Sequence, residues 1–418
     1  MCGISGYCSA TKAVNLAKFY KAHKLLAHRG PDDEGFVTLT NKAYQYAKGD
    51  DTIDNFEKLP HLKDLPDSRL VMGNRRLKIL DLSWHGHQPM TSADGRYTIV
   101  FNGEIYNYRE LRNELIKEGH EFASSCDTEV LLAAYLQWHL SAFEKLNGMW
   151  AIAIFDKEKE ELLLCRDRFG IKPLYYIEKS ESISFASEVK TLLDLHGEHE
   201  FNEQQAIEYL VFSTSDHEED TLFTNVKQVL PGYFLTFKNG SVKKKKWWNF
   251  RPSDDSHLSY KEAQNRLYEL FSRAIDLRLR SDVPVGVALS GGLDSTSIAC
   301  EMAHKEQTTD RFHSFSAVYE EEKFSERKYI EETIRTTNFN PHWIVPTAQD
   351  IEEAFERVLY HQELPFRSMS IVMQALVMAE VRNNSSTVVL LEGQGSDEVF
   401  GGYTNQMLSF CTELMRSL

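Results

Sequence analysis

Short hydrophobic runs separated by glycine, asparagine and aspartate dominate the first half of the chain. Five of these runs have the length and composition of β-strands, at residues 97–107, 149–156, 161–170, 173–178 and 182–189. Between them, apolar residues recur every three or four positions at 128–140, which predicts an amphipathic helix. This arrangement is typical of stacked antiparallel sheets with helices covering their outer faces.

The pattern changes from about residue 258 onward. A long amphipathic stretch reaches residue 279, and strand-like runs then occur within 283–303, 313–319 and 387–395, separated by helical segments. Strands that alternate with helices predict a parallel, doubly wound α/β sheet. We therefore expect two domains, at 1–205 and 259–418.

The stretch between these domains, 206–258, is predicted to be a connecting segment. Its composition becomes polar and acidic at 213–220, and four consecutive lysines follow at 243–246. The lysine run comes just after the turn signal Asn239-Gly240, so we interpret it as one arm of a solvated hairpin rather than a contact for nucleic acid.

Composition restricts the class of function. The 418 residues are 42% apolar and carry a formal net charge of -15, which disfavours nucleic acid or an anionic membrane surface as a partner. The six cysteines show neither paired CxxC motifs nor the spacing of metal ligands, which indicates reduced thiols. Neither a signal peptide nor an apolar span of about 20 residues is recognisable, so we expect a soluble cytoplasmic protein.

Cys2 is the first candidate for chemistry. Removal of Met1 would leave an α-amino group and a thiol on the same residue, and the amine could then act as the general base. Their ordinary pKa values, about 7.7 to 8.0 and about 8.5, are close enough to share a proton near neutral pH. A cysteine at position 2 alone would more often be a buried structural thiol.

Four polar segments that follow Cys2 in order change this balance: HRGPDDEG at 28–35, NRRLKILDLS at 74–83, FNGEIYNY at 101–108 and SSCDTEVLL at 124–132. Taken singly, Asn102-Gly103 would be a tight turn, Arg76 a surface ion pair and Asp127 a helix N-cap. Together with Cys2, the segments resemble the class II glutamine amidotransferases.

That resemblance implies a four-layer αββα sandwich of the N-terminal nucleophile type, in which Cys2 attacks the side-chain amide of glutamine. By the same resemblance, Asn102 and the Gly103 amide form the oxyanion hole. Arg76 would bind the glutamine α-carboxylate, and Glu104 and Asp127 its α-amino group.

A second candidate site follows the strand-like run near residue 285. Ser290-Gly291-Gly292-Leu293-Asp294-Ser295 lacks the lysine of a Walker A loop, but its bare amides and hydroxyls at a helix N-terminus suit phosphate. An SGG turn alone would usually be a simple loop. The full SGGLDS resembles the PP-loop of ATP pyrophosphatases, which transfer AMP to a carboxylate.

The stretch at 393–398, GQGSDE, resembles the second signature of glutamine-hydrolysing asparagine synthetases, and the fused order of the two domains matches that family. The resemblance implies ATP as a substrate, Mg²⁺, and a carboxylate acceptor such as aspartate, and it allows a homodimer. The implied metal ligands are Asp294 and Asp397. The implied ATP contacts are Leu289, Ser290, Gly291, Gly292, Asp294, Ser295, Glu392 and Gly393.

Two departures from the family pattern keep alternatives open. Gln394 stands where many asparagine synthetases have glutamate, and glutamine cannot act as a general base. The chain ends at Leu418, whereas family members continue, so the synthetase domain is expected to be incomplete. The alternatives are an enzyme that amidates another carboxylate and a glutaminase that carries a non-catalytic binding module. A phosphoribosyl pyrophosphate amidotransferase is disfavoured because its acidic strand motif is absent.

Overall fold

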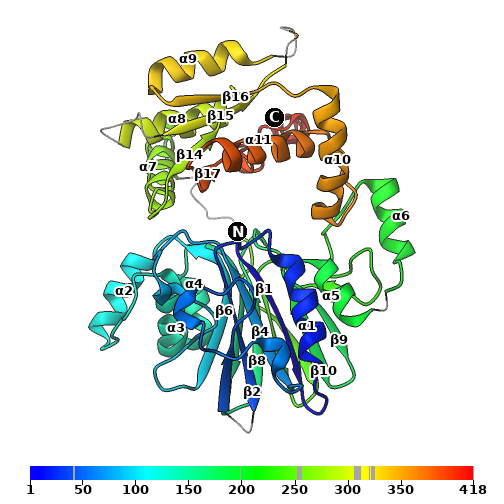
Figure 1. The fold of residues 1–418 in the computed structure, drawn as a ribbon. Coiled ribbons are helices and arrows are strands. Elements are labelled where there is room, and N and C mark those ends of the chain that lie inside the picture. Colours follow the sequence, from blue (N-terminus) through cyan, green and yellow to red (C-terminus); the bar gives the residue numbers. More distant parts are fainter. Residues whose placement is uncertain are drawn as a thin grey trace. The chain divides into compact units, whose positions relative to one another are not determined.

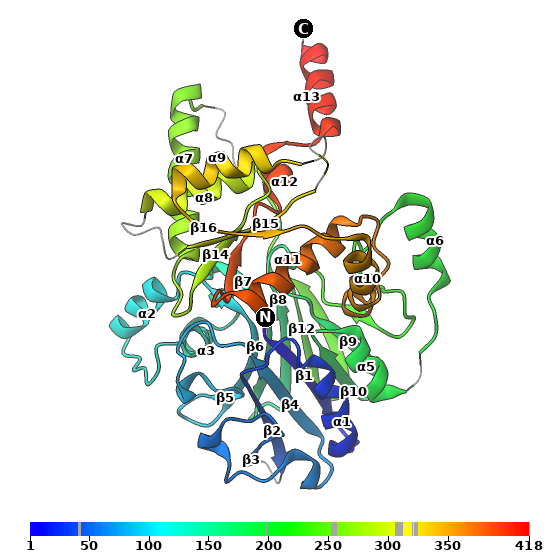
Figure 2. The same ribbon diagram turned by 45° about the horizontal axis from the view of Figure 1, so that its top comes forward.

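The computed structural model of the chain describes residues 1–40, 43–197, 199–251, 257–305, 312–319, 321 and 325–417. They form two compact units, Met1–Asp254 and Asp255–Leu418, each with its own hydrophobic core (Figures 1 and 2). Among the described residues, none of the helices combines the length and the apolar character that crossing a membrane requires.

Two antiparallel sheets form the centre of the first unit. The larger has the strand order β11 (Lys227–Gln228), β9 (Tyr175–Lys179), β10 (Ser182–Ala186), β1 (Gly3–Ser9), β4 (Leu70–Arg76), β2 (Asp33–Thr40), β3 (Ala43–Ala47). The smaller has the order β13 (Ser241–Lys246), β12 (Tyr233–Lys238), β8 (Glu161–Arg166), β7 (Gly148–Asp156), β6 (Tyr97–Ile105), β5 (Met90–Thr91).

The sheets stack because each presents alternate apolar residues to the other. Ile4 and Met72 of the larger sheet share one buried cluster with Val100 and Ala151 of the smaller sheet. The outer face of the larger sheet packs against α1 (Leu16–His23) and α5 (Val189–His196). The outer face of the smaller sheet packs against α2 (Tyr108–Lys117), α3 (Asp127–Trp138) and α4 (Ala142–Lys145). The predicted αββα sandwich is thereby confirmed (Figure 1).

The remaining elements of the first unit are short. They are α6 (Glu203–Phe212) and the 3₁₀ turns η1 (Lys24–Leu26), η2 (Asp54–Phe56), η3 (Leu62–Asp64), η4 (Trp84–Gly86) and η5 (His139–Ser141).

The segment predicted as a connection, 206–258, instead contributes to the sheets of the first unit. β12 pairs with β8, and its residues Phe234, Leu235 and Phe237 are buried in the two cores. Burial of this strand explains why the first unit extends to Asp254 rather than 205. Asn239 and Gly240, with φ of 51° and 76°, form the predicted turn between β12 and the lysine-rich β13.

The second unit contains a four-stranded parallel sheet with the order β16 (Asn340–Ile344), β15 (His313–Ala317), β14 (Val285–Ala288), β17 (Val389–Leu391). Its helices are α7 (Tyr260–Arg278), α8 (Leu293–Lys305), α9 (Arg327–Thr337), α10 (Ala348–Gln362), α11 (Ser370–Asn384), α12 (Ser396–Phe400) and α13 (Thr404–Ser417).

Helices cover both faces of this parallel sheet. One face packs against α7, α8 and α9, and the other packs against α11, on which α10 lies. The doubly wound arrangement predicted from the sequence is therefore confirmed. The sequence pattern did not single out β16, which contains Pro341 and lies at the edge of the sheet, where a residue without an N–H is tolerated.

Candidate active sites

Cys2 immediately precedes β1, at one end of the larger sheet. In the pairing of β1 with β4, Gly3 lies opposite Arg75, which places Cys2 next to Arg76. The Leu77 amide donates a hydrogen bond of 3.4 Å to the Cys2 Sγ. Burial raises the pKa of the thiol, while the adjacent α-amine, Leu77 and Arg76 lower it. The thiol therefore needs a base close by to become a nucleophile.

The α-amine beside Cys2 belongs to Met1 in the full chain. Burial lowers its pKa to about 6; the Cys2 thiolate raises it, and the positive charges of Lys172 and Arg29 lower it. An amine with a low pKa is unprotonated at neutral pH and can accept a proton. The same surroundings would favour the unprotonated α-amine of Cys2 once Met1 is removed.

Arg76 ends β4 and is only 5% exposed. Its guanidinium donates to the carbonyl oxygens of Leu80, Asp81 and Ser83, at 3.1, 2.5 and 3.1 Å. A Cβ at Gly86 would lie 1.9 Å from Nη2 of Arg76, so this loop closes over the guanidinium only because residue 86 is glycine. The loop at 80–86 thus fixes Arg76 in place beside Cys2.

Asn102 of β6 is fully buried, and neither its Oδ1 nor its Nδ2 has a hydrogen-bond partner among the described residues. A buried amide without partners is costly, so such a group in a native fold calls for an explanation. At Gly103, a Cβ would lie 2.3 Å from the Met149 carbonyl oxygen, so only glycine fits. The Asn102 side-chain amide and the Gly103 backbone N–H, which no side chain covers, are suitable donors for the predicted oxyanion hole.

Asp127 is the first residue of α3, and Cys126 rather than Asp127 is the N-cap. Asp127 Oδ2 accepts a hydrogen bond of 2.9 Å from the Ile105 amide of β6. Burial raises the pKa of Asp127 to about 6, against the opposing effect of backbone N–H groups and Arg76. Glu104, also on β6, is only 8% exposed. Both carboxyl groups are thus held at the same end of the smaller sheet.

Several residues of the predicted glutaminase site interact electrostatically with one another. The charge of Arg76 lowers the pKa of both Cys2 and Asp127. Lys172, which the sequence analysis did not identify, interacts with both Cys2 and Glu104. This lysine is only 4% exposed, and burial lowers its pKa to about 8. A single lysine within an apolar run carried no recognisable signal in the sequence.

Glu188 forms a second unpredicted charged group, near the start of β1. Arg29, whose Cδ would lie 3.3 Å from a Cβ at Gly3, donates to Glu188 Oε1 at 2.5 Å, and His28 Nε2 lies 2.8 Å from the same oxygen. Burial would raise the pKa of Glu188, but His28, Arg29 and Lys190 together lower it to about 2. The pairing holds Arg29, one of the cations near the amino terminus, in place.

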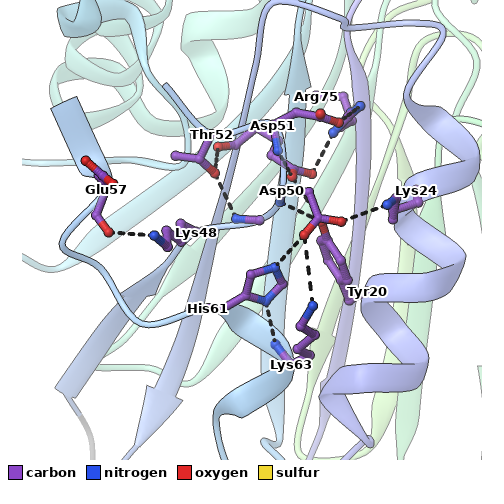
Figure 3. Close-up of polar contacts among 12 residues, drawn as sticks. Tyr20, Lys24, Lys48, Asp50, Asp51, Thr52, Glu57, His61, Lys63 and Arg75 are labelled. Atoms are coloured by element: carbon purple, nitrogen blue, oxygen red, sulfur yellow. Dashed lines mark hydrogen bonds and ion pairs between the residues drawn. The ribbon is translucent and has the colours of Figure 1, made fainter. Parts of the chain in front are cut away.

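Arg75, the neighbour of Arg76, points to the opposite face of β4 and belongs to a separate polar cluster (Figure 3). Its guanidinium donates to Glu34 at 2.6 Å and to Asp51 at 2.8 Å. Next to it, Asp50 accepts from Lys24 at 2.8 Å, which lowers the pKa of Asp50. The cluster ties the loop after β3 to β4 and α1, and we interpret it as structural.

The second candidate site lies in the second unit, where the strand order reverses. The chain passes from β14 to β15 and β16 and then returns to β17 on the other side of β14. SGGLDS follows β14 and GQGSDE follows β17, so both loops leave the carboxyl ends of adjacent parallel strands. Ligands of open α/β sheets bind at such a switch point.

Hydroxyl and amide groups organise the loop after β14. The Ser290 N–H donates to Ser295 Oγ at 3.1 Å, and the two serine hydroxyls are 3.0 Å apart. Gly291 has a φ of 85°, which favours glycine. Leu289 is only 1% exposed and packs in the core, and its N–H donates to the Phe315 carbonyl oxygen at 2.9 Å, so neither its side chain nor its N–H is left for a nucleotide. The loop opens directly into α8, whose N-terminus attracts phosphate.

The loop after β17 contacts the first loop. A Cβ at Gly393 would lie 3.0 Å from the Asp294 Cβ, and one at Gly402 would lie 1.8 Å from the Asp397 Oδ1. Burial raises the pKa of Glu392, whose carboxylate accepts a 2.8 Å hydrogen bond from Gln374. Both predicted metal ligands thus lie in the first turns of helices that follow adjacent strands. Two carboxylates suit Mg²⁺, which takes few protein ligands beside phosphate oxygens.

Two family profiles match the chain, one to each half. Residues 63–248 match the glutamine amidotransferase domain, and residues 266–413 match asparagine synthase. Glutamine-hydrolysing asparagine synthetase 1 of Bacillus subtilis is 32% identical over 96% of this chain and 59% of that protein. A Methanocaldococcus jannaschii protein is named, provisionally, glutamine-hydrolysing asparagine synthetase 2. It is 32% identical over 100% of this chain and 78% of its own length.

More distant similarities are also present. Amidase chyE of Penicillium rubens is 28% identical over 96% of this chain. The chain spans 59% of the length of both the B. subtilis and the P. rubens proteins. Among solved structures, the glutamine phosphoribosylpyrophosphate amidotransferase of B. subtilis gives a TM-score of 0.46 at 16% identity, over 88% of this chain and 71% of that one.

Proposed function

Because the chain belongs to the family of glutamine-hydrolysing asparagine synthetases, we propose that it is an ATP-dependent, AMP-forming amide ligase that takes ammonia from glutamine. The observation that carries the proposal is the buried, unpartnered amide of Asn102 in the unit that bears Cys2. Other buried polar atoms of the described residues also lack partners, but Asn102 stands out because both atoms of its amide do, and an oxyanion hole requires a free donor.

In the glutaminase half-reaction, the α-amine of Cys2 takes the thiol proton after Met1 has been removed. The thiolate attacks the side-chain carbonyl carbon of glutamine, and the Asn102 amide and the Gly103 N–H donate to the resulting oxyanion. The α-ammonium returns its proton to the departing nitrogen, which leaves as ammonia. Water then hydrolyses the thioester to glutamate. Arg76 and Asp127 would hold the two ends of the glutamine backbone.

In the synthetase half-reaction, an oxygen of the acceptor carboxylate attacks the α-phosphorus of ATP, and pyrophosphate leaves. Ammonia then displaces AMP from the acyl-adenylate. Ser290, Gly292 and Ser295 would bind phosphate through amides and hydroxyls at the start of α8. Asp294 and Asp397 would hold Mg²⁺, which neutralises the charge of the pyrophosphate.

Aspartate is our proposed acceptor, and another carboxylate is the alternative. Gln394 motivates the alternative, because an amide cannot remove a proton from incoming ammonia. The P. rubens relative is named an amidase rather than an asparagine synthetase, which also favours a different acceptor. A glutaminase with a non-catalytic synthetase-like unit is the third candidate.

The decisive experiment incubates the chain with glutamine, ATP, Mg²⁺ and aspartate and quantifies glutamate, AMP, pyrophosphate and asparagine. Equal amounts of all four products support the proposal. Glutamate and pyrophosphate formed only with a different acceptor identify the alternative substrate. Glutamate without pyrophosphate, over a panel of carboxylates, indicates the non-catalytic unit. As a control, Cys2→Ala should abolish glutamate formation while ammonium salts still support the synthetase step.

A further inference from the structure

A network of buried hydrogen bonds joins the two sheets next to Asn102. Gln88 Oε1 accepts from the Phe101 N–H at 2.7 Å and from Asn74 Nδ2 at 3.2 Å. Asn74 Nδ2 also donates to the Phe101 carbonyl oxygen at 3.2 Å, and Gln88 Nε2 donates to Thr128 Oγ1 at 3.2 Å. The side-chain residues Asn74, Gln88 and Thr128 are all at most 4% exposed.

Backbone groups determine the orientation of both amides in this network. The Phe101 N–H can only donate, so the atom of Gln88 that faces it must be the carbonyl oxygen. The other amide atom of Gln88 is then the nitrogen that faces Thr128. Asn74 faces two acceptors, the Phe101 carbonyl and Gln88 Oε1, so it must present its nitrogen to them. The network therefore has one arrangement of donors and acceptors, which leaves Asn74 Oδ1 without a partner among the described residues.

Each end of the network adjoins a residue of the glutaminase site. Asn74 is on β4, two positions before Arg76 and on the same face of the strand. Phe101 directly precedes Asn102 on β6. Thr128 directly follows Asp127 on α3. Gln88 thus connects the strand of Arg76, the strand of Asn102 and the helix of Asp127 through one side chain.

Further from the site, the same two sheets are held together by a buried apolar cluster that includes Met72 and Val100. Apolar contacts are not directional, whereas hydrogen bonds restrict distance and angle. Cys2 and Arg76 lie on the larger sheet, and Asn102 and Gly103 lie on the smaller sheet. The separation of the sheets at this end therefore determines how far the nucleophile is from the oxyanion donors.

We propose that Gln88 is a positioning residue for glutamine hydrolysis, one that fixes the spacing of the two sheets between Cys2 and Asn102. The inference rests on the proposed glutaminase function. A displacement of about 1 Å in such a site can lower the rate by about 100-fold. Loss of the bond from the Phe101 N–H to Gln88 should therefore lower kcat through the oxyanion donors, and loss of the bond from Gln88 to Thr128 should weaken glutamine binding through Asp127.

The test compares Gln88→Met, which keeps the length of the side chain without its hydrogen bonds, with Thr128→Val and the matched control Thr128→Ser. Rates are divided by the number of Cys2 thiols that react with a chloroketone analogue of glutamine, so that a loss of folded protein does not count. We expect Gln88→Met to lower kcat per reactive Cys2 at least about 10-fold, in the range of a mispositioned site. Thr128→Val should raise KM for glutamine several-fold with little change in kcat, and Thr128→Ser should behave like the wild type.

A second measurement does not depend on turnover. Hydrogen exchange of the β6 amides, Phe101 to Ile105, should be faster in Gln88→Met than in wild type and unchanged in Thr128→Ser. A kcat per reactive Cys2 within about 2-fold of wild type, or unchanged β6 exchange in Gln88→Met, would overturn the positioning role. If the wild type hydrolyses no glutamine, the proposed function fails, and the exchange result still decides whether Gln88 fixes β6.

Discussion

Replacing Asn102 with leucine should stabilise the first unit while removing most of its glutaminase activity. The side chain is fully buried and both of its polar atoms lack partners. Leaving a buried polar group unsatisfied costs about 1–3 kcal/mol, and leucine of similar size removes that cost. Loss of one oxyanion donor lowers kcat by about 100- to 1,000-fold, equivalent to about 2.7–4 kcal/mol. Stability and activity should therefore change in opposite directions.

Urea unfolding followed by tryptophan fluorescence measures the stability of the first unit, because it contains five of the six tryptophans: Trp84, Trp138, Trp150, Trp247 and Trp248. Glutamate release measures activity. Asn74→Leu is the matched control, since Asn74 is equally buried but donates to Gln88 and Phe101, and its loss should destabilise the unit. If Asn102→Leu unfolds at lower urea concentration than wild type, the amide has a partner in the folded protein and our reasoning is refuted.

Three further predictions concern charged groups. Arg75→Met should lower the free energy of unfolding by about 3–5 kcal/mol, because it leaves the fully buried carboxylate of Glu34 without its cation. Urea unfolding measures this difference, and a loss below about 1 kcal/mol would contradict the prediction. Glu188, whose pKa is lowered to about 2, should stabilise the fold above about pH 4.5, and that contribution should be lost as the pH falls from there towards 2. In unfolding experiments at different pH values, a Glu188→Gln variant should lack this part of the acid dependence. A profile identical to that of the wild type would count against the pairing of Glu188 with His28, Arg29 and Lys190. Lys172→Met should move the acid limb of the glutaminase pH profile to higher pH, because a positive charge that lowers the pKa of the α-amine is removed. An acid limb at the same pH as in the wild type would show that Lys172 does not act on the amine.

Much of the secondary structure and the identity of the reactive groups could be predicted from local sequence. The five strand-like runs of the first half correspond to β6 to β10, and the turn signal Asn239-Gly240 correctly predicted a hairpin, because periodicity and turn chemistry act over a few residues. Strands β1 to β4 and β16, and the contribution of 206–258 to the sheets, were missed. Each of these depends on pairing with strands elsewhere in the chain, which local patterns do not encode.

Local sequence identified which chemical groups this protein contains: a thiol at Cys2, a side-chain amide at Asn102, a backbone N–H without a side chain at Gly103, and a loop rich in serine and glycine at SGGLDS. Which of these groups lie close together depends on how the chain folds. Arg75 and Arg76 are indistinguishable in the sequence, yet strand alternation sends one to the cluster of Figure 3 and the other to the site. Likewise Gln88 and Lys172 acquire their surroundings through burial against residues far away in the chain, because burial and electrostatic environment are properties of packing.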